Sequence, residues 1–425
     1  MYYHSKYTVT FEDDGNIIAV NLLSTALLRL EKEKFIAIQE DRAETAFTQE
    51  EIKALLRMGY INEDNDEFNF LWNRRLQNYE KQTNNIYTIE MLPTTKCNAR
   101  CYYCYESCIE KYDMSFETAD KIVEYIKRNR GDRKVSLKWF GGEPLFKKEI
   151  IDYICGKIKD AGIDYYSSMI TNAYLINDYI EEAESLWNLR FLQITIDAIE
   201  KEYNKIKNYI YKEEDAFERV MNNVGLLLDK DITVILRINF DPRDVKKAIH
   251  TIEYLHKRFG NHKYLKVYCA LIVAEGVPTP FDFPPEENPF LEIFSHLLKY
   301  DYINDLSEMN IRPKLLNCSV HNNEMMIVDP NGGLHKCQHA IINGEQDAFG
   351  DVVNGITDQE KKAVWEELKH PYDECKECVC LPLCQGGCRY RVLHDKQENV
   401  CLPIKNCIKE AVKLFYNKKI KGEKP

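Results

Sequence analysis

Three cysteines on one short loop carry the strongest chemical signal in the sequence. They are spaced as Cys97-x3-Cys101-x2-Cys104. Three thiolates can bind three corners of a cubane [4Fe–4S] cluster, and the fourth iron then has no protein ligand and stays reactive. A zinc site that takes its fourth ligand from elsewhere in the chain is the alternative.

A second motif, Gly141-Gly142-Glu143-Pro144, follows a predicted strand further along the chain. Paired glycines allow a ligand to approach the backbone closely. The Glu143 carboxylate can accept a hydrogen bond from an ammonium group. An ordinary turn is the alternative, but the position directly after the next strand favours a functional segment.

Polar residues stand at the ends of three more predicted strands, where apolar residues would be expected. They are Thr171 with Asn172, Thr195 with Asp197, and Arg237 with Asn239. In parallel α/β sheets the ligands bind at the carboxyl ends of the strands. These residues are therefore candidate ligand contacts, with structural caps or substrate contacts as the alternatives.

The C-terminal quarter holds a second group of cysteines. Thirteen residues separate Cys318 from Gly332 and four more precede Cys337; then come Cys375-x2-Cys378-x5-Cys384-x3-Cys388, Cys401 and Cys407. Eleven of the 15 cysteines lie within residues 97–108 or 375–407. Because a reducing compartment disfavours disulfides, metal ligation is the better explanation, with a zinc ribbon as the alternative for Cys375 and Cys378. The remaining thiols, Cys108, Cys155, Cys269 and Cys380, are expected in apolar surroundings.

The first loop, with Tyr103 before its last cysteine, and the GGEP segment resemble the radical S-adenosylmethionine (SAM) superfamily. The C-terminal cysteines resemble the SPASM extension of radical SAM peptide and protein maturases, with seven positions in register. The resemblance covers residues 86–410.

The resemblance implies that the open iron binds SAM and that its reductive cleavage yields a 5′-deoxyadenosyl radical, which abstracts hydrogen from the substrate. Three [4Fe–4S] clusters, SAM, and an electron donor such as flavodoxin or ferredoxin would be needed. The implied SAM contacts are Tyr103, packed on the adenine, with Gly141, Gly142, Glu143, Pro144, Thr171, Asn172, Thr195, Asp197 and Arg237. Auxiliary cluster I would use Cys318, Cys337 and Cys388; auxiliary cluster II would use Cys375, Cys378, Cys384 and Cys407, with Cys401 as the alternative.

The fourth iron of auxiliary cluster I has no matched cysteine. Cys401, His321, His339 or an acidic residue are candidate ligands, or the iron is open to a substrate thiolate.

Three functions follow from these motifs. The first is a maturase of a ribosomally made precursor peptide, which forms a thioether or carbon–carbon cross-link. The second is an anaerobic sulfatase maturase, which makes formylglycine; those enzymes carry Asp after the cysteine matched by Cys337, whereas this chain has Gln338. The third is a non-catalytic zinc-bearing interaction protein.

The elements that must position these residues form an α/β fold. Six β-rich runs alternate with helix-length segments and predict a partial (β/α)6 TIM-like barrel. The predicted strands are 86–93, 134–140, 165–171, 191–197, 232–240 and 265–273, and helices are expected at 117–128, 217–228 and 290–300.

Four parts are expected along the chain: an N-terminal α+β module (1–85), the radical SAM core (86–310), the SPASM domain (311–415) and a tail (416–425). In the first part we expect strands at 7–11 and 16–20 and helices at 22–29 and 50–58. This part is either a structural extension or a module that binds the leader of a precursor peptide by strand addition.

The formal net charge of −11 argues against binding to a nucleic-acid backbone. No signal peptide and no apolar run of roughly 18 residues is found, so neither a membrane nor export is expected. We therefore expect a cytoplasmic protein.

Overall fold

The computed structural model describes residues 1–82, 85–212, 215–274, 276–314, 316, 318–368, 373–394 and 401–422. The chain forms two compact units. Unit 1 comprises residues 1–82, 279–321 and 368–425; unit 2 comprises residues 83–278 and 322–367. Each unit combines separate segments of the chain, so the expected limits at residues 85, 310 and 415 remain a prediction.

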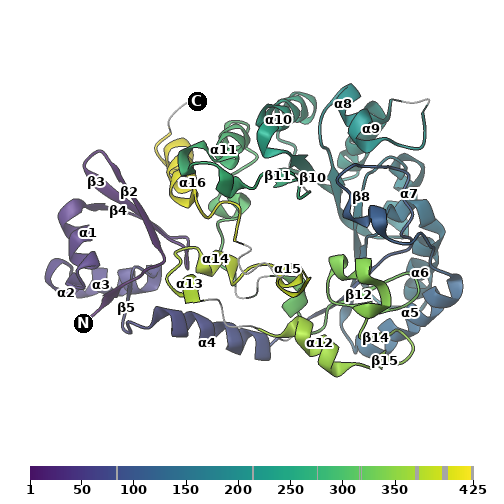
Figure 1. The fold of residues 1–425 in the computed structure, drawn as a ribbon, viewed down its shortest axis with the longest axis horizontal. Coiled ribbons are helices and arrows are strands. Elements are labelled where there is room, and N and C mark those ends of the chain that lie inside the picture. Colours follow the sequence, from purple (N-terminus) through teal and green to yellow (C-terminus); the bar gives the residue numbers. More distant parts are fainter. Residues whose placement is uncertain are drawn as a thin grey trace. The chain divides into compact units, whose positions relative to one another are not determined.

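Unit 2 is built on one mostly parallel sheet (Figure 1). Its strands are β6 (Ile86–Met91), β7 (Lys134–Trp139), β8 (Tyr165–Thr171), β9 (Leu189–Thr195), β10 (Thr233–Phe240) and β11 (Leu265–Leu271), each parallel to the next in chain order. β12 (Met326–Val328) adds in parallel to β6, and β13 (Leu334–His335) runs antiparallel to β12. The six predicted strands and the α/β class are confirmed.

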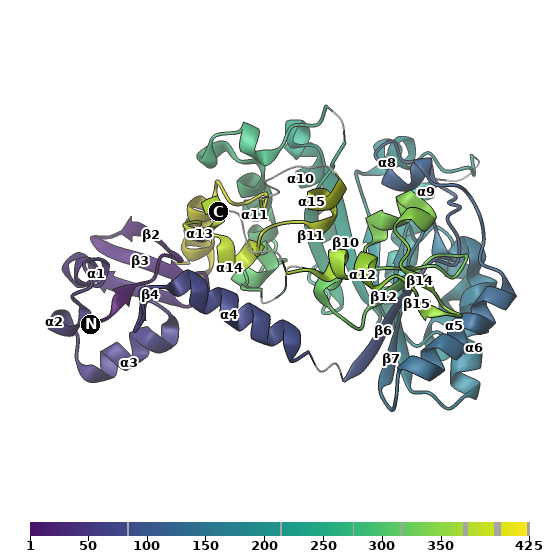
Figure 2. The ribbon, with the colours of Figure 1, turned by 60° about the horizontal axis from the view of Figure 1, so that its bottom comes forward.

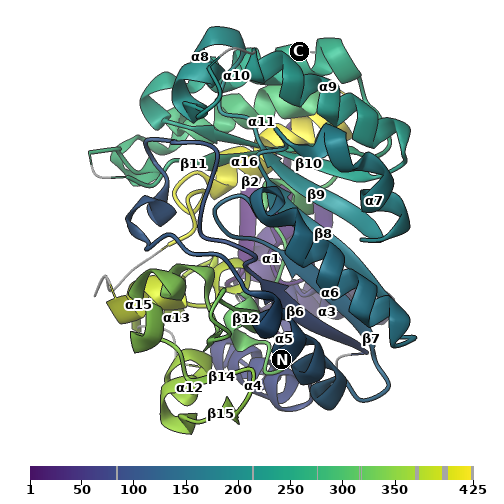
Figure 3. The ribbon, with the colours of Figure 1, turned by 90° about the vertical axis from the view of Figure 1, so that its right-hand side faces the viewer.

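The helices of unit 2 cover one face of this sheet, with α5, α6 and α9 in front of the strands in Figure 3. They are α5 (Phe116–Asn129), α6 (Lys148–Asp160), α7 (Ile180–Ser185), α8 (Glu200–Lys207), α9 (Ala216–Asp229) and α10 (Val245–Phe259). The later segment of unit 2 adds α12 (Gln359–Glu366) and a short hairpin of β14 (Gly350–Asp351) and β15 (Gly355–Ile356). Alternate strand residues such as Ile89, Leu137 and Leu236 are fully buried. Side chains alternate between the two faces of a strand, so these buried apolar residues form the face that the helices cover.

The residues between those apolar positions are polar. Glu90 on β6 is paired in register with Lys138 on β7, and on β10 the same face carries Arg237. Tyr268 on β11 donates a hydrogen bond to Gln193 on β9 at 2.9 Å. Because side chains alternate across a strand, this second face presents charges and amides where the first presents the core.

Unit 1 begins with a small α+β module. Its elements are β1 (Tyr3–His4), β2 (Thr8–Asp13), β3 (Asn16–Asn21), β4 (Leu27–Glu31), α1 (Lys32–Gln39), α2 (Ala43–Ala46), α3 (Gln49–Met58) and β5 (Ile61–Asn62). β2, β3 and β4 form an antiparallel sheet, and β1 pairs with β5. Helix α3 starts in a capping box at Thr48 and ends at Gly59, whose φ of 76° suits glycine.

The helix expected at residues 22–29 is wrong, because residues 27–31 form β4. The Asn21 side chain accepts hydrogen bonds from the backbone amides of Leu23 and Ser24. Thr25 follows with a φ of 59°. This turn, stabilised by the side chain, reverses the chain and returns it alongside β3.

The rest of unit 1 is mainly helical. It contains α4 (Glu67–Glu80), α11 (Pro289–Lys299), α13 (Asp373–Lys376), α14 (Leu381–Cys384), α15 (Arg389–His394) and α16 (Ile408–Phe415), which continues as a π-helical turn (Tyr416–Ile420). Figure 2 shows α4 extending away from the N-terminal sheet. Tyr7, Phe68, Leu71 and Leu381 form one apolar cluster, so α4 packs between the module and the cysteine-bearing segment.

Candidate active site and cysteine clusters

The loop that follows β6 carries Cys97, Cys101 and Cys104. Thr95 Oγ1 donates to the carbonyl of Glu110 at 2.7 Å, and Thr94 Oγ1 donates to Asp113 at 2.6 Å, so the two ends of the loop are tied together. The Cys104 amide donates to the carbonyl of Cys101 at 3.2 Å. These bonds fix the loop at the carboxyl end of the first strand, as the sequence predicted.

The three thiols lie close enough to affect one another's ionisation. Burial, with the nearby Glu143 carboxylate, raises the pKa of Cys97 to about 12, and Cys101 and Cys104 contribute to it. Burial also raises the pKa values of Cys101 and Cys104. Thiolates in such a site need a bound cation, and metal binding supplies it as the protons leave. In the described part of the chain no three Cys, His, Asp or Glu side chains converge on a single ion.

The two glycines of the GGEP segment pack against the cysteine loop itself. A Cβ on Gly141 would lie 2.4 Å from the carbonyl oxygen of Thr94, and one on Gly142 would lie 2.3 Å from that of Lys96. The Glu143 amide donates to the carbonyl of Lys96 at 2.9 Å. The glycines are therefore required for the fit between two backbone segments, and Pro144 then begins a short helical turn.

Glu143 lies fully buried between the cysteine loop and the end of β8. Its carboxylate accepts hydrogen bonds from Thr171 Oγ1 at 2.7 Å, the Asn172 amide at 2.8 Å and the Leu145 amide at 3.2 Å. Burial raises its pKa. Asn172 in turn donates to Asn98 Oδ1 at 2.7 Å, beside Cys97. Cys97, Glu143, Thr171 and Asn172, which the sequence predicted as site residues, therefore lie together.

Tyr103 takes part in a buried polar network. Its hydroxyl donates to Asp197 at 2.7 Å and accepts from Asn239 Nδ2 at 3.2 Å. Asp197 forms an ion pair with Lys207 at 2.7 Å, and the two side chains are 1% and 3% exposed. Although burial acts to lower it, Asp197 raises the pKa of Lys207 well above its usual value. Lys207 also lies near Cys101.

Arg237 and Thr195 are neighbours in register on β10 and β9. Arg237 Nε donates to Asn239 Oδ1 at 2.9 Å, which connects it to the Tyr103 network. The structure therefore brings every expected SAM contact of the strand ends into two adjoining groups, one around Glu143 and one around Asp197.

Sequence reasoning missed three charged residues of this region: Lys207, Glu90 and Glu106. Burial raises the pKa of Glu106 to about 7, and its Oε1 has no hydrogen-bond partner within the described residues. Glu90 accepts a hydrogen bond from Gln338 at 2.6 Å. The charged residue within a predicted strand was a usable signal for Glu90, whereas nothing in the spacing of Lys207 or Glu106 identified them.

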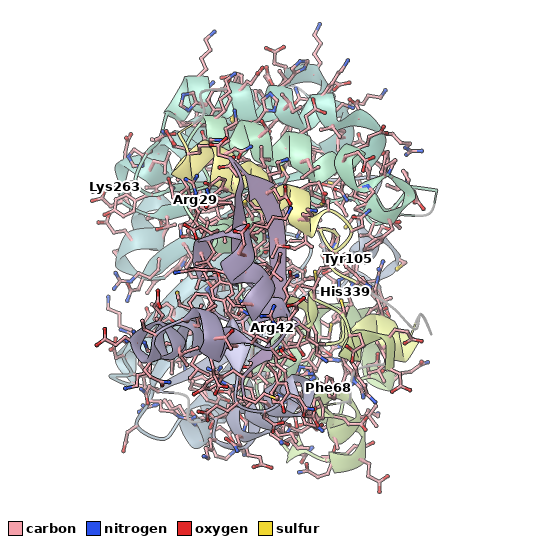
Figure 4. All side chains as sticks on the ribbon, turned by 90° about the vertical axis from the view of Figure 1, so that its left-hand side faces the viewer. Arg29, Arg42, Phe68, Tyr105, Lys263 and His339 are labelled. Atoms are coloured by element: carbon pink, nitrogen blue, oxygen red, sulfur yellow. The ribbon has the colours of Figure 1, made fainter. Side chains whose placement is uncertain are left out.

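The residues after Cys104 and Cys337 meet within unit 2. The rings of Tyr105 and His339 lie 4.2 Å apart, and Figure 4 labels both. His339, a candidate ligand of auxiliary cluster I, thus packs against an aromatic ring. Gln338, which occupies the position where the sulfatase maturases have Asp, is bonded to Glu90.

Within unit 1 the structure brings together Cys375, Cys378, Cys384 and Cys401. Burial, followed by the fields of the other three thiols, raises the pKa of Cys375 to about 11. Cys401 Sγ accepts a hydrogen bond from Lys405 at 3.3 Å. The thiol of Cys407 is fully buried and donates to the carbonyl of Ile404 at 3.6 Å. Cys401, and not Cys407, therefore lies with the other three.

Cys318 and Cys388 also lie near each other in unit 1, and Arg75 and Lys314 are close to Cys318. Cys337, the third cysteine expected in auxiliary cluster I, belongs to unit 2.

Three of the four remaining cysteines, Cys155, Cys269 and Cys380, are buried as expected. The expectation for Cys108 is wrong, because its thiol is exposed at the end of a short 3₁₀ helix, Tyr105–Cys108. Cys380 donates to Cys378, and this bond lowers the pKa of Cys378 to about 6.

None of the helices in the described part of the chain has the length and apolar composition that a membrane-spanning segment requires.

Comparison with known proteins agrees with this geometry. Residues 91–261 match the family described as the Radical SAM superfamily. The match contains the three-cysteine loop, the GGEP segment and the strand ends described above. Residues 91–261 are therefore a radical SAM domain, and enzymes of this superfamily use a [4Fe–4S] cluster and SAM. The alternative of a non-catalytic zinc protein is therefore wrong.

The chain is also similar to one curated enzyme and, in fold, to solved structures. The cysteine-type anaerobic sulfatase-maturating enzyme of Clostridium novyi is 23% identical over 372 residues, which are 77% of this chain and 93% of that enzyme. The solved structure of anSMEcpe with bound AdoMet and a Cp18Cys peptide has a TM-score of 0.58 and 16% identity over 79% of this chain and 98% of that one. Streptococcus suis SuiB bound to its precursor peptide SuiA has a TM-score of 0.52 and 15% identity over 94% of this chain and 98% of that one.

Proposed function

We propose that the chain is a peptide maturase that uses SAM to abstract hydrogen from a ribosomally made precursor peptide and so forms a thioether or carbon–carbon cross-link. The observation that carries this proposal is the extent of the likeness to peptide-bound SuiB. Because it covers 94% of the 425 residues, most of the N-terminal module must lie within it. The anSMEcpe likeness covers 79%.

In this proposal Cys97, Cys101 and Cys104 hold the cluster whose open iron binds SAM. The fit rests on the donor set, three buried thiols with raised pKa values, and on the Asn98 Nδ2 group beside them, which has no partner among the described residues. Glu143, Thr171, Asn172, Asp197 and Arg237, with Tyr103, would surround the SAM. When bound, the cluster and SAM supply the radical; the chain's own residues position it and exclude water.

Two auxiliary [4Fe–4S] clusters complete the proposal, in a SPASM domain at residues 311–415. Cluster II would use Cys375, Cys378, Cys384 and Cys401, since Cys401 lies beside the other three. Cluster I would use Cys318, Cys337 and Cys388, as the sequence predicted.

The electron balance of thioether formation is consistent with this set of cofactors. One hydrogen atom leaves a peptide carbon for the SAM-derived radical. One proton and one electron then leave as the peptide thiol forms the C–S bond. An auxiliary cluster held by the C-terminal cysteines would supply the acceptor for that electron.

The leader of the precursor would add to the edge of β4. The other edge strand of that sheet, β2, is covered by α16, where Tyr416 donates to Asp13 at 3.1 Å. The β4 edge is flanked by the half-buried apolar side chains Leu28, Leu30 and Leu56. Exposed Arg29, labelled in Figure 4, favours an extended segment that carries acidic as well as apolar residues. Strand addition at such an edge gives affinity through main-chain hydrogen bonds.

The sulfatase-maturase function is kept as the second candidate because the Clostridium novyi enzyme is similar over 93% of its length. One observation opposes it: Gln338 is an amide, donates to Glu90 and cannot act as a base.

The discriminating experiment incubates the reconstituted full-length protein anaerobically with SAM, dithionite and one of two probes. The first probe is a set of synthetic cysteine-containing peptides that correspond to short open reading frames near the gene, and the second is a sulfatase peptide with its target cysteine. We expect mass spectrometry to show loss of two hydrogens from the first probe and no change in the second. Formylglycine in the second probe, with the first unchanged, would establish the sulfatase-maturase function instead.

A further inference from the structure

One buried cation of unit 1 has no carboxylate partner among the residues that the structure describes. Arg75 on α4 is 2% exposed. Its Nη1 donates to the carbonyl of Gln385 at 3.1 Å, and its Nε has no hydrogen-bond partner in the described part of the chain. Among the described residues no acidic side chain forms an ion pair with it. Burial lowers the pKa of Arg75 to about 10, so the guanidinium is still charged at neutral pH.

An unpaired charge is costly to bury, so a compensating anion is expected close by. The groups that act electrostatically on Arg75 are Cys318 and Cys384. The first belongs to the thiols proposed for auxiliary cluster I and the second to those proposed for auxiliary cluster II. Arg75 thus lies within electrostatic range of both groups of thiols.

Lys314 occupies an equivalent position. It is half-buried, and Cys384 and Cys318 both act on its charge. Its amide donates to the carbonyl of Pro382 at 2.9 Å. Its carbonyl accepts from Gln385 Nε2 at 2.7 Å. Gln385, which follows Cys384, therefore bonds to both residues: its carbonyl accepts from the Arg75 guanidinium, and its side-chain amide donates to the Lys314 carbonyl.

Helix α4 is also held firmly at its other end. Glu67, in its first turn, accepts hydrogen bonds from Ser5 at 2.6 Å and from Asn62 at 3.0 Å in the N-terminal module. The helix has 14 residues, a length of about 21 Å at 1.5 Å per residue. Arg75 is therefore positioned by a helix whose first turn is bonded to the N-terminal module, outside the cysteine-bearing segment.

We propose that Arg75 and Lys314 form a cationic bridge between the two auxiliary clusters and raise the reduction potential of both. This inference rests on the proposed auxiliary clusters. Reduction adds one negative charge to a cluster, and a nearby buried cation stabilises the more negative state. Because the interaction is buried, salt screens it little. Arg75 and Lys314 are positioning residues in this account and do not touch the substrate.

The test uses full-length protein in which Cys97, Cys101 and Cys104 are replaced by Ala, so that only the auxiliary clusters give signals. Arg75→Met, Arg75→Lys and Lys314→Met are compared with Arg74→Met, which removes an exposed charge from the same helix. Iron content and EPR-monitored redox titration are measured for each variant.

We expect Arg75→Met to lower the reduced-to-oxidised ratio of both clusters at fixed potential by roughly tenfold, which is 59 mV for a one-electron couple. Arg75→Lys should restore most of this change, and Arg74→Met should cause none. Lys314→Met, at a more exposed site that tolerates substitution, should shift both clusters in the same direction by less.

Two results would overturn the inference. One is unchanged potentials in both Arg75→Met and Lys314→Met with full iron content. The other is an equal shift in Arg75→Met and Arg75→Lys, which would indicate a packing effect. Absence of EPR signals from the parent triple variant would instead refute the proposed auxiliary clusters themselves.

Discussion

The two cysteine-bearing regions of the molecule differ in how a buried cation is neutralised. In unit 2, Lys207 lies beside Cys101 but is paired with Asp197 at 2.7 Å. In unit 1, Arg75 lies near Cys318 and Cys384 with no acidic partner among the described residues. A neutralised pair exerts a weak field on its surroundings, whereas an unpaired charge exerts a strong one. The first region is therefore built to hold polar groups in fixed positions, and the second to alter the energy of added negative charge.

A second contrast concerns what holds each set of thiols. The first loop is fixed by backbone contacts that leave no space for a side chain at Gly142. In the second set, Cys375 and Cys384 lie on α13 and α14, helices of four residues each, and Cys378 and Cys401 lie outside helices. We therefore expect the first set to be positioned by the protein alone and the second to depend on a bound metal for stability.

The largest effect is expected from Gly142→Ala. The added Cβ would lie 2.3 Å from the carbonyl oxygen of Lys96, so the cysteine loop must move away. We expect loss of the SAM-cleaving activity and of about four irons per chain, with the auxiliary clusters retained. Iron analysis and EPR measure both. Gly156→Ala, in open space on α6, is the matched control and should leave iron unchanged; iron loss from all clusters alike would contradict the local effect.

Comparing Cys401→Ala with Cys407→Ala should show which of the two cysteines is a metal ligand and which is a core residue of unit 1. Cys401→Ala should remove the iron of auxiliary cluster II, about four per chain, together with much of the solubility of that segment. Cys407→Ala should keep its iron and lose only packing, since the Cys407 thiol is fully buried and donates to the carbonyl of Ile404. The reverse pattern in iron content would restore Cys407 as the ligand.

Lys207→Met should test the ion pair between Lys207 and Asp197 near the first cysteine loop. It leaves Asp197 buried without its counter-charge, and we expect a loss of about 3–5 kcal/mol in the free energy of unfolding. The double variant with Asp197→Asn should recover most of it, as measured by urea denaturation of the apo protein. A double variant as unstable as the single one would show that the pair is not the cause.

A smaller effect is expected from the pH dependence of Glu90. Burial raises the pKa of this carboxyl above its model-compound value of 4.5. The folded state then binds more protons than the unfolded state above pH 4.5, so the stability of the apo protein should fall as the pH rises through this window. Glu90→Gln should flatten that part of the profile in thermal denaturation, whereas Glu50→Gln, at an exposed site, should not. Identical slopes in all three proteins would contradict the assignment.

Six of the strands of unit 2, β6 to β11, were predictable because each is an apolar run bounded by polar or turn residues. β9 was displaced by only two residues, from 191–197 to 189–195. The loop cysteines and Glu143 were predictable because motifs place chemistry directly after a strand. β4 was not, since the turn that creates it depends on bonds from the Asn21 side chain to backbone amides.

The buried charges escaped prediction for a related reason. Lys207 and Arg75 appear in sequence as ordinary helical residues, and only tertiary packing buries them. The choice between Cys401 and Cys407 likewise depends on how the chain returns to Cys375. Motif spacing predicts which residues bind a cofactor. It does not identify the buried charged residues that set the electrostatic field around that cofactor.

The central claim is that Cys97, Cys101 and Cys104 hold an open cluster where SAM is cleaved. The most direct test compares 5′-deoxyadenosine formed from SAM and dithionite by the reconstituted parent protein and by a variant with all three cysteines replaced by Ala. We expect the variant to form none above background while keeping its auxiliary iron and EPR signals. Continued SAM cleavage by that variant at the parent rate would contradict the account.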